Sequence, residues 1–283
     1  MSHSFHPTSL REYDIRGIIG ETLGEADAYA IGRGFGTCLV RAGGKKAAVG
    51  YDGRVSSPML EEALVKGLND SGADVVRIGM GPTPMLYYAE AVLDDVDGGI
   101  EITGSHNPAN YNGFKMVLMG KPFFGADILK LGHMAATGDW VEGVGSFEHF
   151  DILDQYVARV AQAAPQKAFR IGWDAGNGAA GPAIEKLVKM LPGEHHLLFV
   201  EVDGQFPNHH PDPTDPANLF DLQRLVAEKQ LDFGVAFDGD GDRIGAIDGE
   251  GRVIWGDQLL QIYAADVLGE VPGATIIADV KAS

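Results

Sequence analysis

Two short stretches of the sequence bring together side chains that could do chemistry with one another. The first is Thr103-Gly104-Ser105-His106-Asn107-Pro108, which offers a hydroxyl on a glycine-containing turn beside an imidazole and an amide. The second is Asp238-Gly239-Asp240-Gly241-Asp242-Arg243, which places three carboxylates at alternate positions before an arginine. An alcohol nucleophile and an oxygen-only cation site are the two parts that phosphoryl transfer through a covalent enzyme intermediate requires. We therefore expect the fold to bring both stretches together around one Mg²⁺.

The three carboxylates favour a metal site. Acids at alternate positions with glycines between them can turn their oxygens toward one point, and they repel one another unless a cation neutralises them. The calcium EF-hand loop begins in the same way, but Arg243 stands where that loop needs glycine and Gly249 where it needs glutamate. Mg²⁺ is typically held by only a few protein ligands, and a phosphate oxygen can complete its coordination shell. The remaining alternative is an Asp-Gly turn that exposes its acids to water.

The serine stretch is less specific on its own, because serine after Thr-Gly often only forms a turn. Ser105 follows a predicted buried strand and precedes His106, which favours a nucleophile, although His106 alone also fits a hydrogen-bonded loop histidine. Lys115 could neutralise a phosphate or lie in solvent. Arg16 and Arg243 each lie beside glycine-rich turns, and the planar guanidinium group suits phosphate.

Three further polar residues are assigned structural roles. Asn177 lies between two glycines, which predicts a turn with positive φ instead of a substrate contact. His209 and His210 have prolines on both sides and no cysteine partner, so we do not expect them to bind a metal.

Strands alternate with helices along the chain, which predicts α/β units with mostly parallel sheets and helices on both faces. The expected strands cover about residues 47–51, 74–78, 98–102, 169–174, 197–202, 233–237 and 274–281. The expected helices cover about residues 25–43, 57–71, 83–92, 149–165, 181–191, 219–229 and 259–267, and residues 114–118 and 126–135 complete the first unit. Both chemical stretches follow strands, where α/β proteins bind their ligands.

A repeated strand-plus-acid pattern predicts related domains. Asp52, Asp174 and Asp279 each end a predicted strand, about one domain length apart. We predict a first α/β domain over residues 1–150 with the serine stretch and a second over 151–252 with the acidic stretch. Residues 253–283 would be the opening βαβ of an incomplete third copy, which suggests a piece of a longer chain.

The composition restricts the partners and the compartment. The chain has 22 Lys and Arg against 40 Asp and Glu, a formal net charge of −18, which disfavours nucleic acid. Any phosphate site must therefore gather its basic residues locally. The single cysteine, Cys38, fits a reducing compartment. The sequence has neither a signal-peptide core nor an apolar run of roughly 20 residues, so we predict a cytoplasmic protein that does not enter a membrane.

The two stretches resemble the phosphoserine loop and the metal loop of the α-D-phosphohexomutase superfamily, and within it the bacterial phosphomannomutase/phosphoglucomutase branch. Other segments resemble that branch in the same order, namely Tyr13–Gly17, Tyr51–Arg54, Pro82–Pro84, Tyr111–Lys115, Phe206–Pro213 and Asp279–Lys281. The family fold implies four domains around a central cleft, the first three being related α/β units. By this resemblance the rest of domain III and all of domain IV are absent from the chain.

The resemblance implies an intramolecular phosphotransferase of the isomerase class. Phosphorylated Ser105 would give its phosphoryl group to a hexose phosphate of mannose or glucose. The resulting 1,6-bisphosphate would reorient and return the other phosphoryl group, leaving the isomer. Glucose 1,6-bisphosphate or mannose 1,6-bisphosphate would act as activator, and we expect a monomer for the full-length protein.

The resemblance also assigns roles to residues. Asp238, Asp240 and Asp242 would hold Mg²⁺ together with an oxygen of phosphorylated Ser105. The negative charge of the transferring phosphoryl group would be spread by Arg16, Lys115 and Arg243, and the group would be positioned by His106 and Asn107. The substrate would be contacted by Tyr13 and Lys281.

Two alternatives to a mannose and glucose phosphate mutase remain. The first is an amino-sugar phosphate mutase, although that branch typically has alanine where Gly104 stands. The second is a catalytically silent fragment that binds Mg²⁺.

Overall fold

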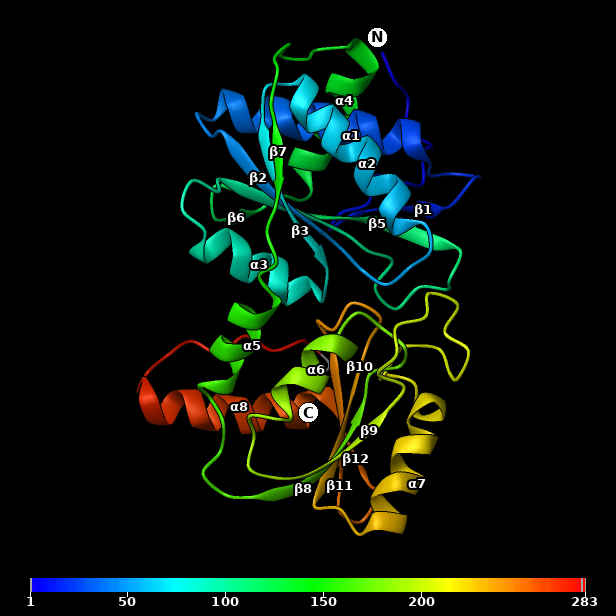
Figure 1. Cartoon of the computed structure of the whole chain (residues 1–283), viewed down its shortest axis with the longest axis vertical. Helices are drawn as coiled ribbons and strands as arrows, with labels where there is room; N and C mark the ends of the chain where they lie inside the picture. Colours follow the sequence, from blue (N-terminus) through cyan, green and yellow to red (C-terminus); the bar gives the residue numbers. More distant parts are fainter. Residues whose placement is uncertain (1, 281, 283) are drawn as a thin grey trace.

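The chain folds into two α/β units, each built around one sheet, that lie one above the other along the long axis of the molecule (Figure 1). The computed structural model describes residues 2–280 and residue 282. The predicted fold class, α/β with mixed and mostly parallel sheets, is confirmed, because each sheet combines a parallel centre with antiparallel strands at one side.

The first sheet has the strand order β1-β5-β4-β2-β3-β7, with β6 paired to β5. Its strands are β1 (Ile15–Ile18), β2 (Lys46–Tyr51), β3 (Asp74–Met80), β4 (Gly98–Ile102), β5 (Tyr111–Leu118), β6 (Lys121–Pro122) and β7 (Phe147–His149). Strands β4, β2, β3 and β7 run parallel, whereas β5 is antiparallel to both β4 and β1. The central strand β4 is buried at every residue and leads directly into the serine stretch.

Helices cover both faces of this sheet and make it a three-layer unit (Figure 1). Helices α1 (Glu25–Arg41), α2 (Ser57–Asp70) and α4 (Ala126–Thr137) bury their apolar side chains in one core. Helix α3 (Thr83–Val92) packs in a second core on the other face, together with residues at the start of α5 (Leu153–Ala161). Apolar residues at helical spacing produce these faces.

The second sheet has the order β12-β11-β10-β8-β9. Its strands are β8 (Phe169–Asp174), β9 (Gly193–Leu198), β10 (Phe233–Phe237), β11 (Ile244–Asp248) and β12 (Val253–Ile254). Helices α6 (Gly181–Leu187) and α8 (Gly256–Glu270) contribute to the core on one face, and the 3₁₀ helix η1 (Pro216–Leu219) and α7 (Phe220–Lys229) to the core on the other. Among the helices of the described residues, none has the length and apolar character needed to cross a bilayer.

Two details of the second unit differ from the expectation. The strand expected over residues 197–202 is β9, which begins four residues earlier because Gly193–Leu198 pairs in parallel with β8. As an edge strand with no fully buried residue, β9 tolerates the polar residues His195 and His196, which hid it from a search for apolar runs. The hairpin of β10 and β11 around the acidic stretch was also missed.

The expected opening βαβ of a third unit, residues 253–283, is not formed as predicted. Strand β12 pairs with β11 and therefore completes the second sheet. Helix α8 follows, but residues 274–280 form no strand, and Asp279 does not end one. An isolated strand is unstable because its backbone groups have no partner strand. Among the described residues no neighbouring strand lies beside 274–280, and Lys281 lies outside the described residues.

Helices α1 and α2 cross with their backbones in direct contact at Gly32 and Gly67. A Cβ added at Gly32 would lie 3.1 Å from Gly67 Cα and closer still to the carbonyl oxygen of Leu64. One added at Gly67 would lie 2.9 Å from the backbone nitrogen of Arg33. No side chain fits at this crossing without separation of the helices.

We predict that Gly32→Ala lowers the free energy of unfolding by about 1–3 kcal/mol, the usual cost of overpacking a core, although alanine favours a helix by about 1 kcal/mol over glycine. Gly269→Ala in α8, where nothing lies within 4 Å of the added Cβ, is the matched control and should leave stability unchanged or raised. Urea unfolding of both variants tests the packing, and equal stability of the two would contradict it.

Candidate active site

Ser105 lies in the loop that follows β4, at the carboxyl end of the first sheet. The residue is buried, with 2% of its surface exposed. Its φ angle of 48° lies in the left-handed region, which costs a residue with a side chain about 1–3 kcal/mol. The Ser105 amide donates a hydrogen bond to Thr103 Oγ1 at 2.8 Å, so the conformation is fixed within the loop.

The three aspartates lie in the turn between β10 and β11, at the carboxyl end of the second sheet. Asp238 and Asp240 are fully buried, whereas Asp242 is exposed. One carboxylate oxygen of each residue lies within 4.8 Å of the other two, so the trio can converge on one cation. Asp240 Oδ1 is a buried oxygen that has no hydrogen-bond partner in the part of the chain that the structure describes. This donor set fits a hard divalent cation.

The two loops meet directly across the boundary between the units. Ser105 Oγ donates a hydrogen bond to Asp238 Oδ2 at 2.8 Å. Thr83 strengthens the junction, because its amide donates to the Asp240 carbonyl at 2.8 Å and its hydroxyl to Asp240 Oδ2 at 2.6 Å. The nucleophile candidate and the acidic trio therefore share one site, as the sequence predicted.

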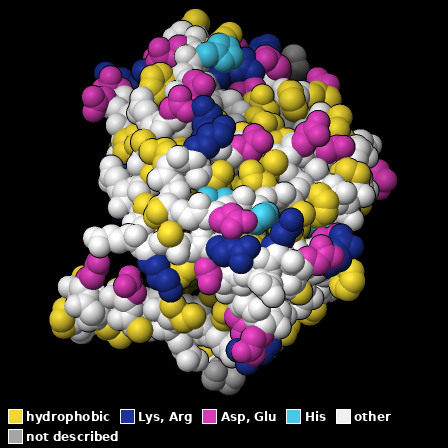
Figure 2. Space-filling view, turned by 60° about the horizontal axis from the view of Figure 1, so that its bottom comes forward, with side chains coloured by type: hydrophobic (Ala, Val, Ile, Leu, Met, Phe, Trp, Pro, Cys, Tyr) yellow, Lys and Arg dark blue, Asp and Glu magenta, His cyan; other side chains and the backbone are white. Residues whose placement is uncertain are grey.

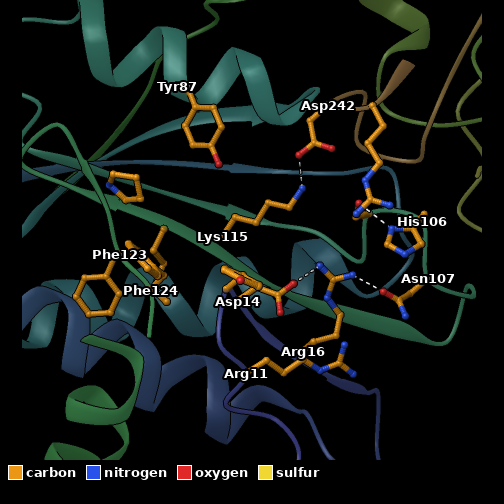
Figure 3. A pocket seen from close by; sticks show the side chains of 15 residues that line it. Arg11, Asp14, Arg16, Tyr87, His106, Asn107, Lys115, Phe123, Phe124 and Asp242 are labelled. Carbon is orange, nitrogen blue, oxygen red and sulfur yellow. Dashed lines mark hydrogen bonds and ion pairs between the residues drawn. The ribbon is translucent and has the colours of Figure 1, made fainter. Parts of the chain in front are cut away.

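Lys115 on β5 reaches the same trio. Its Nζ lies 2.6 Å from Asp240 Oδ2. It also lies 2.5 Å from Asp242 Oδ2, a contact that Figure 3 shows. Burial alone would lower the pKa of Lys115, but the two carboxylates outweigh burial and raise it. The lysine is therefore charged and offsets part of the buried negative charge.

The two buried aspartates have pKa values that differ strongly. Burial, together with the charges of Asp240 and Asp242, raises the pKa of Asp238 to about 7. Although burial opposes it, Lys115 lowers the pKa of Asp240 to about 2. The pair thus holds a proton on Asp238 at slightly acid pH, because two adjacent buried carboxylates do not both ionise without a compensating charge.

Basic and polar side chains line a pocket of about 370 Å³ that opens in front of Ser105 (Figure 3). Arg16 on β1 donates from Nη1 to the Gly104 carbonyl and to Asn107 Oδ1, and from Nη2 to Asp14 at 2.5 Å. Its buried Nε has no partner among residues 2–280. Arg243 is exposed at the rim of the same pocket.

His106 is half-buried beside the nucleophile candidate, with Nδ1 3.4 Å from Ser105 Oγ. Burial lowers the pKa of His106, and the nearby Arg243 lowers it further. The imidazole is therefore neutral at neutral pH and can accept a proton.

The remaining predicted residues divide into those inside and those outside this pocket. Tyr13 lines the pocket with 79% of its surface exposed, and Lys281 lies outside the described residues. Asn177 has φ of 58°, which confirms the predicted turn. His209 Nε2 lies 3.0 Å from Asp174 Oδ2. In the part of the chain that the structure describes, the group of side chains that could hold a metal ion is the three aspartates, without His209 or His210.

Sequence reasoning missed several residues that the site uses. Thr83 bonds Asp240, Tyr87 and Arg11 line the pocket, and Arg54 contacts the serine loop. Thr83 could have been found, because it follows β3 at the same end of the sheet as Ser105. Arg54 stands in the segment Tyr51–Arg54, which resembles the family, but no role was assigned to it, and Tyr87 and Arg11 carried no local signal.

Two sequence models match the chain in succession. The model described as phosphoglucomutase/phosphomannomutase, alpha/beta/alpha domain I, matches residues 7–139, and the model of alpha/beta/alpha domain II matches residues 151–251. Together they cover strands β1 to β6 of the first sheet and β8 to β11 of the second.

Curated relatives and solved structures agree with these matches. The chain is 47% identical over 277 residues to a phosphomannomutase/phosphoglucomutase of Pseudomonas putida, covering 97% of this chain and 60% of the relative. It is 44% identical to a phosphoglucomutase of Neisseria gonorrhoeae, again covering 60% of that protein. A crystal structure of a phosphoglucomutase/phosphomannomutase family protein from Burkholderia thailandensis is 43% identical, with a TM-score of 0.92, and covers 95% of this chain and 61% of that one.

The chain thus spans about 60% of the length of the curated relatives it matches. Both domain matches, the identity to these relatives and the fold lead to the same assignment. The chain belongs to the phosphoglucomutase/phosphomannomutase family.

Proposed function

We propose that this chain carries the phosphoryl-transfer centre of an isomerase that interconverts hexose 1-phosphates and hexose 6-phosphates of mannose, glucose or both. The observation that carries the proposal is the 2.8 Å hydrogen bond between Ser105 Oγ and Asp238 Oδ2, which joins an alcohol nucleophile to an acidic cation site. Residues 1–150 would form the domain that bears the nucleophile, and residues 151–252 the domain that bears the acids.

The proposed reaction has two transfers. In the first, the P–O bond of phosphorylated Ser105 breaks as a new P–O bond forms to a hydroxyl of the hexose phosphate. That hydroxyl loses its proton to a base, and the freed Ser105 oxygen takes up a proton. In the second, the other phosphoryl group of the 1,6-bisphosphate passes to Ser105. The sugar oxygen that it leaves takes up a proton, and the Ser105 hydroxyl must lose its own. The nearest acceptors for that proton are Asp238 Oδ2 at 2.8 Å and His106 Nδ1 at 3.4 Å.

Mg²⁺, held by Asp238, Asp240, Asp242 and an oxygen of Ser105 or its phosphate, would supply charge neutralisation at the transferring group. The orphaned Asp240 Oδ1 and the raised pKa of Asp238 support this choice of ligands. Lys115 would offset the remaining carboxylate charge.

The basic residues of the pocket suit a phosphorylated sugar. Arg16 and Arg243 would spread the charge of the transferring group, because a preorganised guanidinium stabilises it without reorganisation. Asn107 would keep Arg16 oriented through its amide oxygen. Tyr13 at the rim, and Lys281, would meet the substrate.

The surface supports a small-molecule substrate. Figure 2 shows Lys and Arg side chains interspersed with Asp and Glu, with no single basic face on the side drawn. We therefore expect no nucleic-acid partner, and we expect a cytoplasmic monomer that depends on glucose 1,6-bisphosphate or mannose 1,6-bisphosphate as activator.

We predict that glucose 1,6-bisphosphate with Mg²⁺ adds one phosphoryl group to the chain and none to Ser105→Ala, since the acceptor oxygen is then missing. Intact-mass spectrometry gives the readout. Ser71→Ala, which removes another buried serine hydroxyl far from the pocket, is the control and should be phosphorylated as the parent. Phosphorylation of the Ser105 variant to the same extent would remove Ser105 from its role, and a chain that only binds Mg²⁺ would show no added mass.

A second prediction concerns the pH dependence of metal binding. Asp238 has a pKa of about 7, above its ordinary value, and must lose its proton to bind Mg²⁺. Affinity should therefore rise with pH, about tenfold between pH 6 and pH 8, with release of a proton.

Titration calorimetry in buffers of different ionisation enthalpy measures both the affinity and the proton release. Asp240→Asn should weaken binding at every pH, whereas Asp94→Asn, an exposed acid elsewhere, should leave it unchanged. An affinity independent of pH, or equal in the two variants, would argue against the assigned ligands.

A further inference from the structure

A buried ion pair lies beneath the serine loop, and the proposed chemistry does not use it. Arg54 and Asp52 follow β2, both are about 1% exposed, and Arg54 Nε lies 3.0 Å from Asp52 Oδ2. A buried guanidinium is costly unless every donor is satisfied, so its remaining partners indicate what it does.

The terminal nitrogens of Arg54 donate hydrogen bonds to the backbone of the serine loop. Nη2 donates to the carbonyl oxygens of Ser105 at 2.8 Å and Asn107 at 2.6 Å. Nη1 donates to those of Pro108 at 2.5 Å and Tyr111 at 2.9 Å. Four carbonyl groups of one loop therefore converge on a single side chain.

The loop is closely fitted to the guanidinium. A Cβ built at Gly104 would lie 2.7 Å from Arg54 Nη1 and closer still to Cζ and Nε. The residue before the nucleophile thus rests against the plane of the arginine, and glycine at this position permits the approach.

Asp52 holds the opposite side of the same loop. Its Oδ2 accepts hydrogen bonds from the Gly104 amide at 3.0 Å and from Thr103 Oγ1 at 2.9 Å. Its Oδ1 accepts from the Arg54 amide at 3.0 Å and from Ser57 Oγ at 2.7 Å. The carboxylate therefore fixes the start of the loop while the guanidinium fixes its middle and end.

Arg54 also faces the second unit. Its Cζ lies 5.2 Å from the centre of the Phe206 ring, within range of a cation–π contact. A Cβ at Gly204 would lie 2.8 Å from Arg54 Cα, so the backbones of the two units touch here. Any shift of Arg54 would move the serine loop relative to the unit that bears the acids.

We propose that Arg54 is the positioning residue for the nucleophile. By binding four backbone carbonyl groups, it holds Ser105 in its left-handed conformation with Oγ directed at Asp238. Lysine cannot replace it, because an ammonium group has three donors around one point instead of a planar fork with five. The inference rests on the proposed function only for its kinetic readout.

The kinetic test compares Arg54→Lys and Arg54→Gln with Arg33→Lys. Arg33 is likewise buried and hydrogen-bonded, but it lies on α1, far from the serine loop. Arg33→Lys therefore measures the general effect of replacing a buried arginine on the rate. Ser105 phosphorylation by glucose 1,6-bisphosphate is followed at saturating and at limiting bisphosphate.

Both Arg54 variants should lose about a hundredfold in the maximal rate, the effect expected of a misplaced reacting group, with little change in the half-saturating concentration. Arg33→Lys should keep the parent rate at comparable stability. An Arg54→Lys rate within a few-fold of the parent, or an equal loss in Arg33→Lys, would overturn the inference.

Hydrogen exchange gives a readout that needs no catalysis. Arg54→Lys should speed exchange of the amides of residues 104–111 and leave α1 and β8 unchanged, whereas Arg33→Lys should not affect that loop. If the parent chain is not phosphorylated at all, the proposed function fails, and the exchange result alone decides the role of Arg54. Unchanged exchange in residues 104–111 would overturn it.

Discussion

Two carboxylates are buried next to a serine hydroxyl at the contact between the two α/β units, and the rest of the structure depends on this burial. Asp238 and Asp240 have almost no exposed surface, and Lys115 of the other unit brings a positive charge to Asp240, with Nζ 2.6 Å from Oδ2. The hydrogen bond from Ser105 closes the same contact. The two units are therefore held together by the groups proposed to react, so their relative position and the chemistry are coupled.

The charge distribution explains how a chain of net charge −18 can present a phosphate site. Arg16 lies on β1 and Lys115 on β5, which are neighbouring strands of the first sheet, and Arg243 follows the acidic turn of the second. Arg16 and Lys115 have different carboxylate partners, but both of them and Arg243 line one pocket. The acidic excess elsewhere leaves this pocket as a local concentration of positive charge.

Sequence reasoning identified the features that depend on local pattern. Ser105 was singled out because it follows a predicted buried strand, and the aspartates because they alternate with glycines. The alternation of strands and helices gave the fold class. The edge strand β9 was missed because its polar residues conceal it. A strand was predicted over residues 274–281, but residues 274–280 form no strand in the part of the chain that is described. Arg54 was noted only as part of a segment that resembles the family, and its role was missed because it depends on carbonyl groups more than fifty residues away.

One cation should be shared by groups from both units. Anomalous diffraction from crystals soaked in Mn²⁺, which takes the same oxygen ligands as Mg²⁺, tests it most directly. We expect one strong peak at about 2.0–2.2 Å from oxygens of Asp238, Asp240 and Asp242 and from an oxygen of Ser105 or its phosphate. A fully occupied ion bound elsewhere, with Ser105 turned away from the three aspartates, would contradict it.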